Sequence, residues 1–460
     1  MGGGTLQLAA YGEQDIYLTG NPIMSYFKYV YKRHTNFSIE TIEYPMDGTV
    51  GVNETKTSVE LNSNSGDLLY KCTLQLEFTA DINRSGDKNN DENFIIFYSA
   101  FINGTGYAYI KEVSIAIGEQ IIDTHYSEWF DIWNELTDTI KNEYFMVNKN
   151  IGKTSYLYSV KNSGESDEDE VTWMSEDNKL ICYVPLQFWF CKNPGLALPL
   201  VALQHHSIKF YFTFRKMTGM INTNLVQLSN PNVPPNVNLL VDYIYLDKEE
   251  RTKFAISKHQ YLIEQVQRIE PQSLKQSHKL NFNHPVKEIL WVCRNKTAGT
   301  EASTLTNTEN PYETDATQNL STKLHTDWKK NDYFNYVTSK KDLNNLETVG
   351  GIKSYEPFKT ASILFNNIER VRKRKPSYFR IVQPCNYHSK VPTKHIYLYS
   401  FALKPEQLQP SGTCNFSIIQ HPEIIFENPT INSDMEITFF AINYNMLCIM
   451  NGMGGLRFSN

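Results

Sequence analysis

Few side chains in this sequence have the type and spacing that catalysis requires. The phosphate-binding pattern GxxxxGK[ST], the nucleophile pattern GxSxG and the zinc pattern HExxH are all absent, as is a strand–GxGxxG–helix unit. Glycine runs occur at residues 2–4 and 452–455, and neither run connects a strand to a helix. We therefore expect no catalytic residue and no cofactor.

The eleven histidines do not form a metal-binding pattern. His205 and His206 are adjacent in an expected strand, so their side chains point to opposite faces and cannot chelate one ion together. No HxH with a downstream glutamate is present. We expect no metal site.

Two runs of like charge are candidates for binding. Residues 167–170 are all acidic but lack the interleaved spacing and glycine of a calcium loop, which favours a solvated loop. The basic run at 370–375 could contact nucleic acid, a nuclear import receptor or an acidic partner surface. A solvated helix end is the simpler interpretation, since cations suit a helix C-terminus. The candidate basic patch consists of Arg370, Arg372, Lys373, Arg374 and Lys375.

The composition limits the class of protein. The 460 residues are 41% hydrophobic and 13% aromatic, which suits packed cores, and the length suggests about two domains. A net charge of −6 is unlike that of a nucleic-acid-coating protein. Seven isolated cysteines fit a reducing compartment, and the opening residues lack the pattern of a signal peptide. The longest apolar stretch, residues 184–204, is interrupted by Lys192, Pro194 and Pro199 and is not expected to span a membrane.

Alternating apolar and polar residues predict two series of β-strands. In residues 68–79, for example, Leu74, Leu76 and Phe78 are expected on one face. The first series lies at 36–44, 68–79, 111–123, 179–190, 206–214 and 238–247, and the second at 260–270, 279–284, 286–293, 395–403, 413–420, 423–427 and 435–450. Helices are expected only at 127–140, at about 360–371 and in the opening stretch. This pattern predicts an all-β protein of two tandem β-sandwiches.

The two halves also resemble each other locally. "FWFCKNPGLALP" and "SFALKPEQLQP" each end a strand with a lysine and a proline, followed by leucine and a second proline. Polar insertions at 81–94, 160–176 and 295–355 are expected to project into solvent. This local similarity between the halves indicates a duplicated domain.

The opening stretch is unusually apolar for the start of a chain. Residues 2–19 are predicted to form an extended arm. Asn21 could then cap a short docking helix that has Pro22 in its first turn and Val30 on its apolar face. The candidate contact residues of the arm and docking helix are Tyr11, Asp15, Tyr17, Asn21, Pro22, Tyr26, Phe27 and Tyr31.

This opening stretch, "LQLAAYGEQDIYLTGNP" followed by "FKYVYKRHTNFSIE", resembles the amino terminus of the major capsid proteins of large icosahedral double-stranded DNA viruses of the phycodnavirus, mimivirus and marseillevirus kind. Further blocks of the same family resemblance occur in order along nearly the whole chain. They are "NPGLALPLVALQHH", "VDYIYLDKEERTKFA", "HQYLIEQVQ", "LNFNHPVK", "YLYSFALKPEQLQPSGTCNFS" and "NYNMLCIMNGMGGLRFSN".

The resemblance implies a double jelly roll, with an N-terminal arm at 1–25, a first jelly roll at 26–248, a linker at 249–259 and a second jelly roll at 260–460. It further implies a homotrimer that forms a pseudo-hexagonal tile of an icosahedral shell around a double-stranded DNA genome. The implied partners are neighbouring capsomers and minor capsid proteins beneath the shell. An inner viral membrane could also lie beneath the shell, apposed indirectly. No direct sequence-specific binding of nucleic acid is implied. The implied location is the virion, after synthesis and folding in the host cytoplasm.

Other functions stay open at this point. The chain could be a minor or paralogous capsid protein, or a glycan-binding shell protein of the same fold. An enzyme on a double-β scaffold is disfavoured by the missing catalytic residues.

Overall fold

The computed structural model describes residues 2–61, 65–79, 98–101, 104–137, 156–159, 179–223, 234–295, 333–334, 336, 356–429 and 435–459. The polar insertions at 81–94 and 160–176, including the acidic run 167–170, lie outside these ranges. So does most of the insertion at 295–355. Met1–Phe37 forms one compact unit and Ser38–Asn460 another.

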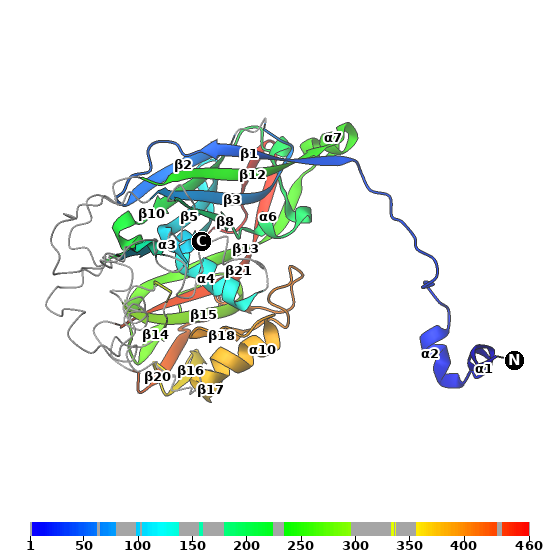
Figure 1. Cartoon of the computed structure of the whole chain (residues 1–460). Coiled ribbons are helices and arrows are strands. Elements are labelled where there is room, and N and C mark those ends of the chain that lie inside the picture. Colours follow the sequence, from blue (N-terminus) through cyan, green and yellow to red (C-terminus); the bar gives the residue numbers. More distant parts are fainter. Residues whose placement is uncertain are drawn as a thin grey trace, which may run out of the picture. The chain divides into compact units, whose positions relative to one another are not determined.

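The first half of the larger unit is a sandwich of two four-stranded antiparallel layers (Figure 1). Its strands are β1 (Phe37–Pro45), β2 (Thr55–Leu61), β3 (Leu68–Thr79), β5 (Ile110–Ile117), β6 (Gln120–Tyr126), β8 (Lys179–Pro185), β10 (Ile208–Phe214) and β12 (Asn236–Leu246). One layer has the order β1-β12-β3-β8 and the other β2-β10-β5-β6.

The second half repeats this arrangement. Its strands are β13 (His259–Ser273), β14 (Ser277–Lys279), β15 (Pro285–Asn295), β16 (Thr360–Phe365), β17 (Ile368–Arg374), β18 (Ile396–Ser400), β20 (Glu423–Glu427) and β21 (Met435–Met450). The layers are β13-β21-β15-β18 and β14-β20-β16-β17. Counted within its own half, each sandwich has the strand order 1-8-3-6 in one layer and 2-7-4-5 in the other. This is the order of a jelly roll, so the expected all-β double jelly roll is confirmed.

Shorter elements connect or extend these strands. The helices after the arm are α3 (Thr105–Tyr109), α4 (Ser127–Leu136), α6 (Trp189–Lys192), η2 (Pro194–Leu196), η3 (Leu200–Ala202), η4 (Met217–Met220), α7 (Lys248–Ile256), the π-helix η5 (Tyr378–Val382) and α10 (Gln383–Tyr387). The strands β11 (Ile221–Thr223), β4 (Tyr98–Phe101) and β7 (Tyr156–Ser159) form a small third sheet, while β9 (Leu198–Pro199), β19 (Cys414–Asn415) and β22 (Met453–Leu456) pair with β3, β15 and β21. No helix in the described ranges has both the length and the apolar character needed to cross a bilayer.

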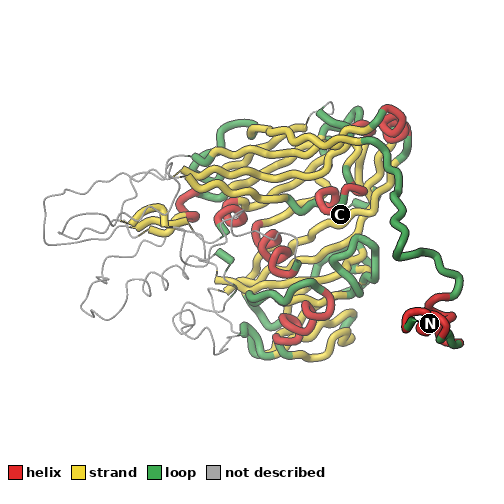
Figure 2. Tube along the Cα trace, turned by 45° about the vertical axis from the view of Figure 1, so that its right-hand side comes forward, coloured by secondary structure: helices red, strands yellow, loops and turns green. Residues whose placement is uncertain are grey.

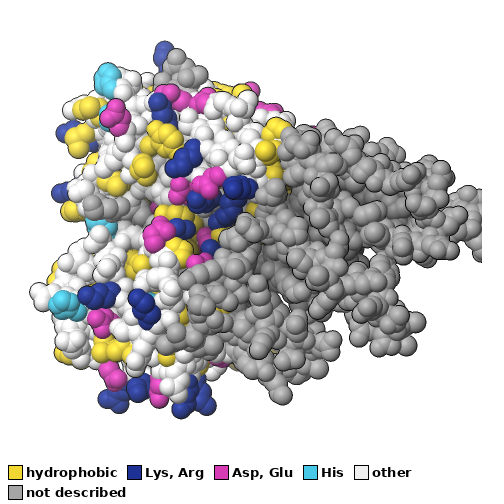
Figure 3. All heavy atoms as spheres, turned by 90° about the vertical axis from the view of Figure 1, so that its left-hand side faces the viewer, with side chains coloured by type: hydrophobic (Ala, Val, Ile, Leu, Met, Phe, Trp, Pro, Cys, Tyr) yellow, Lys and Arg dark blue, Asp and Glu magenta, His cyan; other side chains and the backbone are white. Residues whose placement is uncertain are grey.

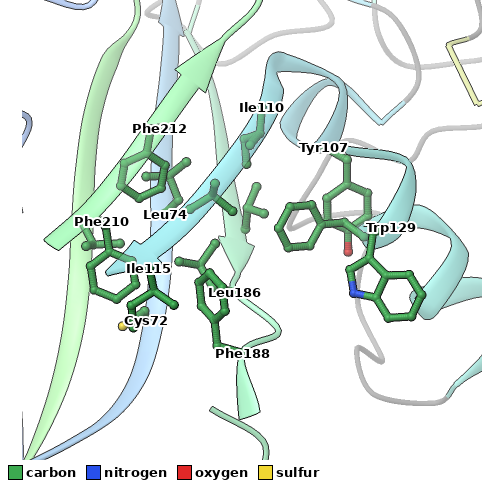
Figure 4. Packing of buried hydrophobic residues seen from close by; sticks show 14 of the residues in the cluster. Cys72, Leu74, Tyr107, Ile110, Ile115, Trp129, Leu186, Phe188, Phe210 and Phe212 are labelled. Carbon is green, nitrogen blue, oxygen red and sulfur yellow. The ribbon is translucent and has the colours of Figure 1, made fainter. Parts of the chain in front are cut away.

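Alternation along the strands builds the first core. Leu74, Leu76 and Phe78 of β3 are completely buried, as the sequence predicts, while the intervening side chains face outward. On the opposite layer, Phe210 of β10 pairs with Ile115 of β5. Figure 4 shows Leu74, Phe210 and Ile115 in the space between the two layers. Burial of apolar surface at roughly 25 cal/mol per Å² is the main stabilising contribution here.

The layer β13-β21-β15-β18 is apolar on both faces. Along β15, Ile289 and Trp291 belong to the core of the second sandwich, whereas Leu290 and Val292 join the core of the first. The continuous apolar run of this strand is typical of a strand covered on both sides. The two sandwiches therefore share a core and form one compact unit. For this reason, the predicted domain boundaries at 25, 248 and 259 stay predictions, although α7 occupies the expected linker.

The two echoing stretches occupy equivalent positions. "FWFCKNPGLALP" follows β8 and "SFALKPEQLQP" begins at the end of β18, and each of these is the sixth strand of its sandwich. Together with the repeated strand order, this supports a duplicated domain.

The predicted helix at 360–371 is wrong. These residues form the hairpin β16–β17, with Asn366 and Asn367 in left-handed backbone conformations at φ 52° and 64°. Two consecutive residues with positive φ are typical of the tight turn that matches the twist of paired strands. Pairing of β16 with β20 then places Ala361 and Ile363 in the second core. The helix predicted at 127–140 is confirmed as α4, which ends at Leu136.

Candidate assembly surfaces

The arm exposes most of its apolar side chains. Within the arm unit, the side chains of Tyr17 and Phe27 are 91% and 99% exposed. Other exposed apolar residues of this unit are Leu6, Leu8, Tyr11, Ile16, Leu18, Ile23, Met24, Tyr26, Tyr29, Val30 and Tyr31. So many exposed apolar side chains along one segment are typical of a surface that another molecule covers.

The predicted conformation of the arm is wrong in two respects. Residues 2–19 are not extended, because they form α1 (Gly3–Ala9), η1 (Glu13–Asp15) and α2 (Ile16–Thr19). The docking helix after Pro22 is absent, and Asn21 adopts a left-handed φ of 48° instead of the extended backbone of a helix cap. A short helix rich in aromatic and β-branched residues needs a packing surface, and residues 22–31 remain exposed here.

Asp15 has a local structural role in this unit. Its carboxylate accepts a hydrogen bond of 2.8 Å from the Gly12 amide and closes the turn before α2. Tyr11 accepts a hydrogen bond of 3.3 Å from the Thr19 hydroxyl. These contacts hold the arm's helical segment together and leave its apolar side chains free for a partner.

Helix α4 joins the two sandwiches (Figure 1). Nine of its ten residues are buried, and its Trp129 ring lies 6.1 Å from that of Phe440 on β21. On its other side, Phe130 stacks on Tyr107 of α3 at 5.8 Å. The helix therefore contacts both sandwiches, and Figure 4 shows Trp129 beside Tyr107.

A buried ion pair accompanies this apolar contact. Glu128 of α4 is 1% exposed, and its Oε1 lies 2.9 Å from a guanidinium nitrogen of Arg294 on β15. Burial alone would raise the pKa of Glu128, but Arg294, Arg215 and Arg268 lower it to about 2. The carboxylate thus remains ionised inside the interface between sandwiches.

Two tyrosines from the sequence range 295–355 lie at this interface. Tyr333 donates a hydrogen bond of 2.8 Å to Glu128, and Tyr336 donates one of 3.1 Å to Asp131. Lys394 of the second sandwich also binds Asp131, at 2.5 Å. Sequence analysis missed this anchor, although three aromatic residues within 333–336 of a polar insertion are a usable signal.

A second charged cluster links the sandwiches beside the echoing stretches. The Glu264 carboxylate binds Lys192 of the first sandwich at 2.8 Å and Lys287 of β15 at 2.5 Å. Burial alone would raise the pKa of Glu264, but the two lysines lower it to about 2. A pocket of about 410 Å³ opens here, and both echoing stretches line it, through residues such as Asn193 and Pro410.

His388 is clamped between two carboxylates. Its Nε2 lies 2.8 Å from Glu288 and its Nδ1 3.0 Å from Glu406. Burial alone would lower the pKa of His388, but these two glutamates raise it to about 9. At neutral pH, His388 is therefore in its charged imidazolium form between the two glutamates.

The raised pKa of His388 predicts a pH-dependent stability. Because the folded pKa of about 9 exceeds the ordinary 6.5, this contribution is full below about pH 6.5 and is lost as pH rises through 9. Urea unfolding between pH 6 and 9.5 is expected to show this fall in the wild type and a flatter profile in His388→Gln. His34→Gln, in the exposed part of the arm, is the control and should keep the wild-type slope. Equal slopes in wild type and His388→Gln would contradict the assignment.

The candidate basic patch lies on a strand and not on a helix end. Arg370, Arg372, Lys373 and Arg374 belong to β17, the edge strand of the layer β14-β20-β16-β17, and Lys375 follows it. All five residues are exposed. Charged side chains on an edge strand discourage unwanted strand pairing. The five residues of the patch therefore lie together, at the edge of a sheet and not at the end of a helix.

The described part of the face shown in Figure 3 has no single dominant charge. On the described part of the face in Figure 3, acidic and basic side chains are interspersed with apolar ones. Such a surface differs from the continuous basic footprint of proteins that coat nucleic acids. Within the described ranges, no group of three histidine, cysteine or acidic side chains is arranged to hold a metal ion.

Comparison with solved structures defines the class of protein. The capsid chain of the PBCV-1 virus superposes with a TM-score of 0.69 at 29% identity, covering 95% of this chain and 100% of that one. The Faustovirus major capsid protein, at 13% identity and a TM-score of 0.63, shares the fold over 96% of this chain and 94% of that one. The repeated strand order and these matches define a double jelly-roll shell protein.

The sequence comparisons identify the family. The model described as "Major capsid protein N-terminus" matches residues 25–247, and "Large eukaryotic DNA virus major capsid protein" matches 250–455. The major capsid proteins of Pyramimonas orientalis virus and Paramecium bursaria Chlorella virus 1 are 35% and 34% identical, each over 100% of both chains. The chain belongs to the family of major capsid proteins of large eukaryotic DNA viruses. It is a structural component of a virus capsid and not an enzyme.

Proposed function

We propose that three copies of this chain form a trimeric capsomer, a pseudo-hexagonal tile in an icosahedral shell around a double-stranded DNA genome. The observation that supports this most directly is the repeated strand order, because three chains then supply six similar sandwiches to one ring. A ring of identical chains needs two different, complementary surfaces on each copy. No catalysis is part of this function.

The mass of the purified protein tests the trimer. Native mass spectrometry and light scattering should give three times the chain mass of 53.2 kDa, and class averages of single particles should show a near-sixfold outline. A monodisperse monomer over the whole accessible concentration range would overturn the proposal.

We assign the arm to contacts between capsomers or with minor capsid proteins beneath the shell. The contact residues are the ones that the sequence predicts for the arm, and Tyr17 and Phe27 are its most exposed aromatic residues. Burial of such side chains by a partner is favourable by about 1.5–3 kcal/mol each before ordering costs. The family resemblance also leads us to propose that the chain is synthesised and folds in the host cytoplasm. The assembled shell is then apposed to an inner viral membrane.

Deletion of residues 1–24 is expected to leave the sandwiches folded and the trimer intact, while the yield of assembled shells falls at least several-fold. Thermal unfolding checks the fold, light scattering checks the trimer, and sedimentation of particles measures assembly. The double variant Tyr17→Ser/Phe27→Ser should reproduce part of the loss, and Gln7→Ser/Gln14→Ser is the matched polar control. Unchanged shell yield after the deletion would exclude an assembly role for the arm.

A further inference from the structure

The duplicated sandwiches place a helix at the same point of each chain half. In the first, α4 follows the fifth strand, β6, and in the second, η5 and α10 follow the fifth strand, β17. Both helical segments precede the sixth strand of their sandwich. They are therefore equivalent elements, and their surroundings can be compared.

Helix α4 is covered on two sides. One side packs into its own sandwich, and the other lies against the layer β13-β21-β15-β18, through Trp129 and Phe440. Two ion pairs connect α4 with the second sandwich, and their acidic members are both on α4. Glu128 binds Arg294, and Asp131 binds Lys394 just before β18.

The equivalent segment η5–α10 is covered on one side only. Phe379 packs 5.2 Å from Trp291 in the second core, and Gln383 accepts a hydrogen bond from the Ser400 amide. On the other side, Ile381 and Val382 are each 43% exposed, and Cys385 is exposed as well. Thus η5–α10 has an uncovered side, whereas its counterpart α4 has nine of ten residues buried.

The layer equivalent to β13-β21-β15-β18 is β1-β12-β3-β8 of the first sandwich. Its outward face carries cross-strand rows set by the register, such as Asn238–Gln75–Tyr183 and Leu240–Thr73–Pro185. Tyr183 is exposed, and the neighbouring Ile181 on β8 is exposed as well. One end of this face is covered by α7, whose Phe254 packs against Leu68 and Ile244, and the two rows above lie outside that cluster.

The segments that flank η5–α10 are basic, whereas the outward face of the first-sandwich layer is acidic. Residues 370–390 contain seven lysines and arginines and no aspartate or glutamate. Within η5–α10 itself the charged residue is Arg380, which binds Glu356 at 2.8 Å. The outward face of β1, β12 and β3 carries Glu43, Asp242 and Glu77, with Lys71 as its basic residue. At the internal interface, the acidic groups are on α4, and the cations Arg294 and Lys394 belong to the second sandwich.

We propose that the uncovered face of η5–α10 docks on the outward face of β1-β12-β3-β8 of a second copy of this chain. The arrangement repeats between copies the contact that α4 makes within one chain. This inference rests on the proposed trimer and names the surfaces that form it. The contact is heterologous, the kind of contact that closes three copies into a ring when a threefold rotation relates successive copies.

The composition of the two interfaces fits their order of formation. The internal contact is apolar and buries Leu290, Val292 and Phe440 as the chain folds. The outward face of β1-β12-β3-β8 is mostly polar, so a folded monomer can stay dissolved before it meets another copy. Interfaces formed by folded partners are typically more polar than cores.

A charge inserted into the exposed apolar side tests the proposal. The double variant Ile381→Asp/Val382→Asp should raise the concentration at which the trimer dissociates by roughly 30-fold or more, as for a central interface residue. Its thermal unfolding as a monomer should match the wild type, because both side chains face outward. Ile418→Asp, at another exposed apolar residue of the second sandwich, is the matched control and should remain trimeric.

Cross-linking provides a second readout that needs no loss of folding. Tyr183→Cys places a thiol on the receiving face, and a short bis-maleimide should link it to the native Cys385 of another copy, giving covalent dimers and trimers. Tyr183→Cys/Cys385→Ser should lose these products, and Ile418→Cys should not form them above the wild-type background.

The outcomes separate the two proposals. A wild-type monomer would overturn both the trimer and this interface. The interface alone would be overturned by three results together. The wild type is a trimer, Ile381→Asp/Val382→Asp leaves its dissociation concentration unchanged, and Tyr183→Cys gives no cross-link to Cys385. Should the double aspartate variant fail to fold, the cross-linking result decides by itself.

Discussion

Replacing Trp129 by alanine is expected to lower the free energy of unfolding by about 3–5 kcal/mol. Trp129 is 2% exposed, and its ring contacts Trp133 at 5.4 Å and Phe440 at 6.1 Å. The cavity would open at the contact between the two sandwiches, where backbone from both would need to shift to close it. Urea unfolding and scanning calorimetry measure the loss.

The position of the cavity also predicts the shape of the unfolding transition. Loss of Trp129 weakens the coupling between sandwiches, so calorimetry should resolve a broadened or split transition. Trp291→Ala is the matched control, because Trp291 is fully buried in the core of the second sandwich alone. It should cost a similar free energy without splitting the transition. A loss below about 1 kcal/mol for Trp129→Ala would contradict the proposed role of α4.

Replacing Arg294 by methionine is expected to cost about 3–5 kcal/mol at pH 7, because it leaves the buried Glu128 without its nearest cation. The wild-type pKa of Glu128 is about 2, below its ordinary value of 4.5. A lowered folded pKa contributes stability that is present above about pH 4.5 and is lost as pH falls toward 2. The difference between wild type and variant should therefore shrink as the solution is acidified.

Two further variants identify the cause. Glu128→Gln/Arg294→Met should recover part of the lost stability, since the buried charge of Glu128 is removed together with that of Arg294. Glu436, which Arg294 binds at 2.6 Å, loses this partner in both variants, so the recovery is partial. Arg251→Met removes an arginine that binds Asp67 at 2.8 Å while 61% exposed, and it should cost less than about 1 kcal/mol. A loss for Arg294→Met that stays constant from pH 7 to pH 2.5 would show that Glu128 is not responsible.

The strands were predictable because their signal is local. Alternation in β3 follows directly from the two-residue repeat of an extended chain, and the structure buries Leu74, Leu76 and Phe78 together. Continuous apolar runs such as that of β15 indicate coverage on both faces. The identity of the second covering layer depends on residues far away in the chain, which no local pattern contains.

The errors share one physical origin. Residues 360–371 have apolar spacing compatible with a helix, and pairing with β20 together with the Asn366–Asn367 turn decides for a hairpin. The arm residues 22–31 have an amphipathic pattern, yet a short helix is marginal without a surface to pack on. In both cases the tertiary environment outweighs a weak local preference.

Some of the candidate surfaces could be recognised from the sequence, and others could not. The exposed apolar arm and the basic run at 370–375 were visible as unusual composition, and the structure keeps both exposed. The buried set around Glu128 was invisible, because Arg294 and Tyr333 reach it only through folding of the second sandwich and its insertion.

The sequence by itself determined the two series of strands, the absence of recognisable catalytic motifs and the membership of a capsid protein family, since all three depend on residue order along the chain. Only the tertiary structure decided which faces are covered. It showed that α4 is enclosed by two sandwiches while η5–α10 is enclosed by one, because coverage depends on which distant surfaces meet in space.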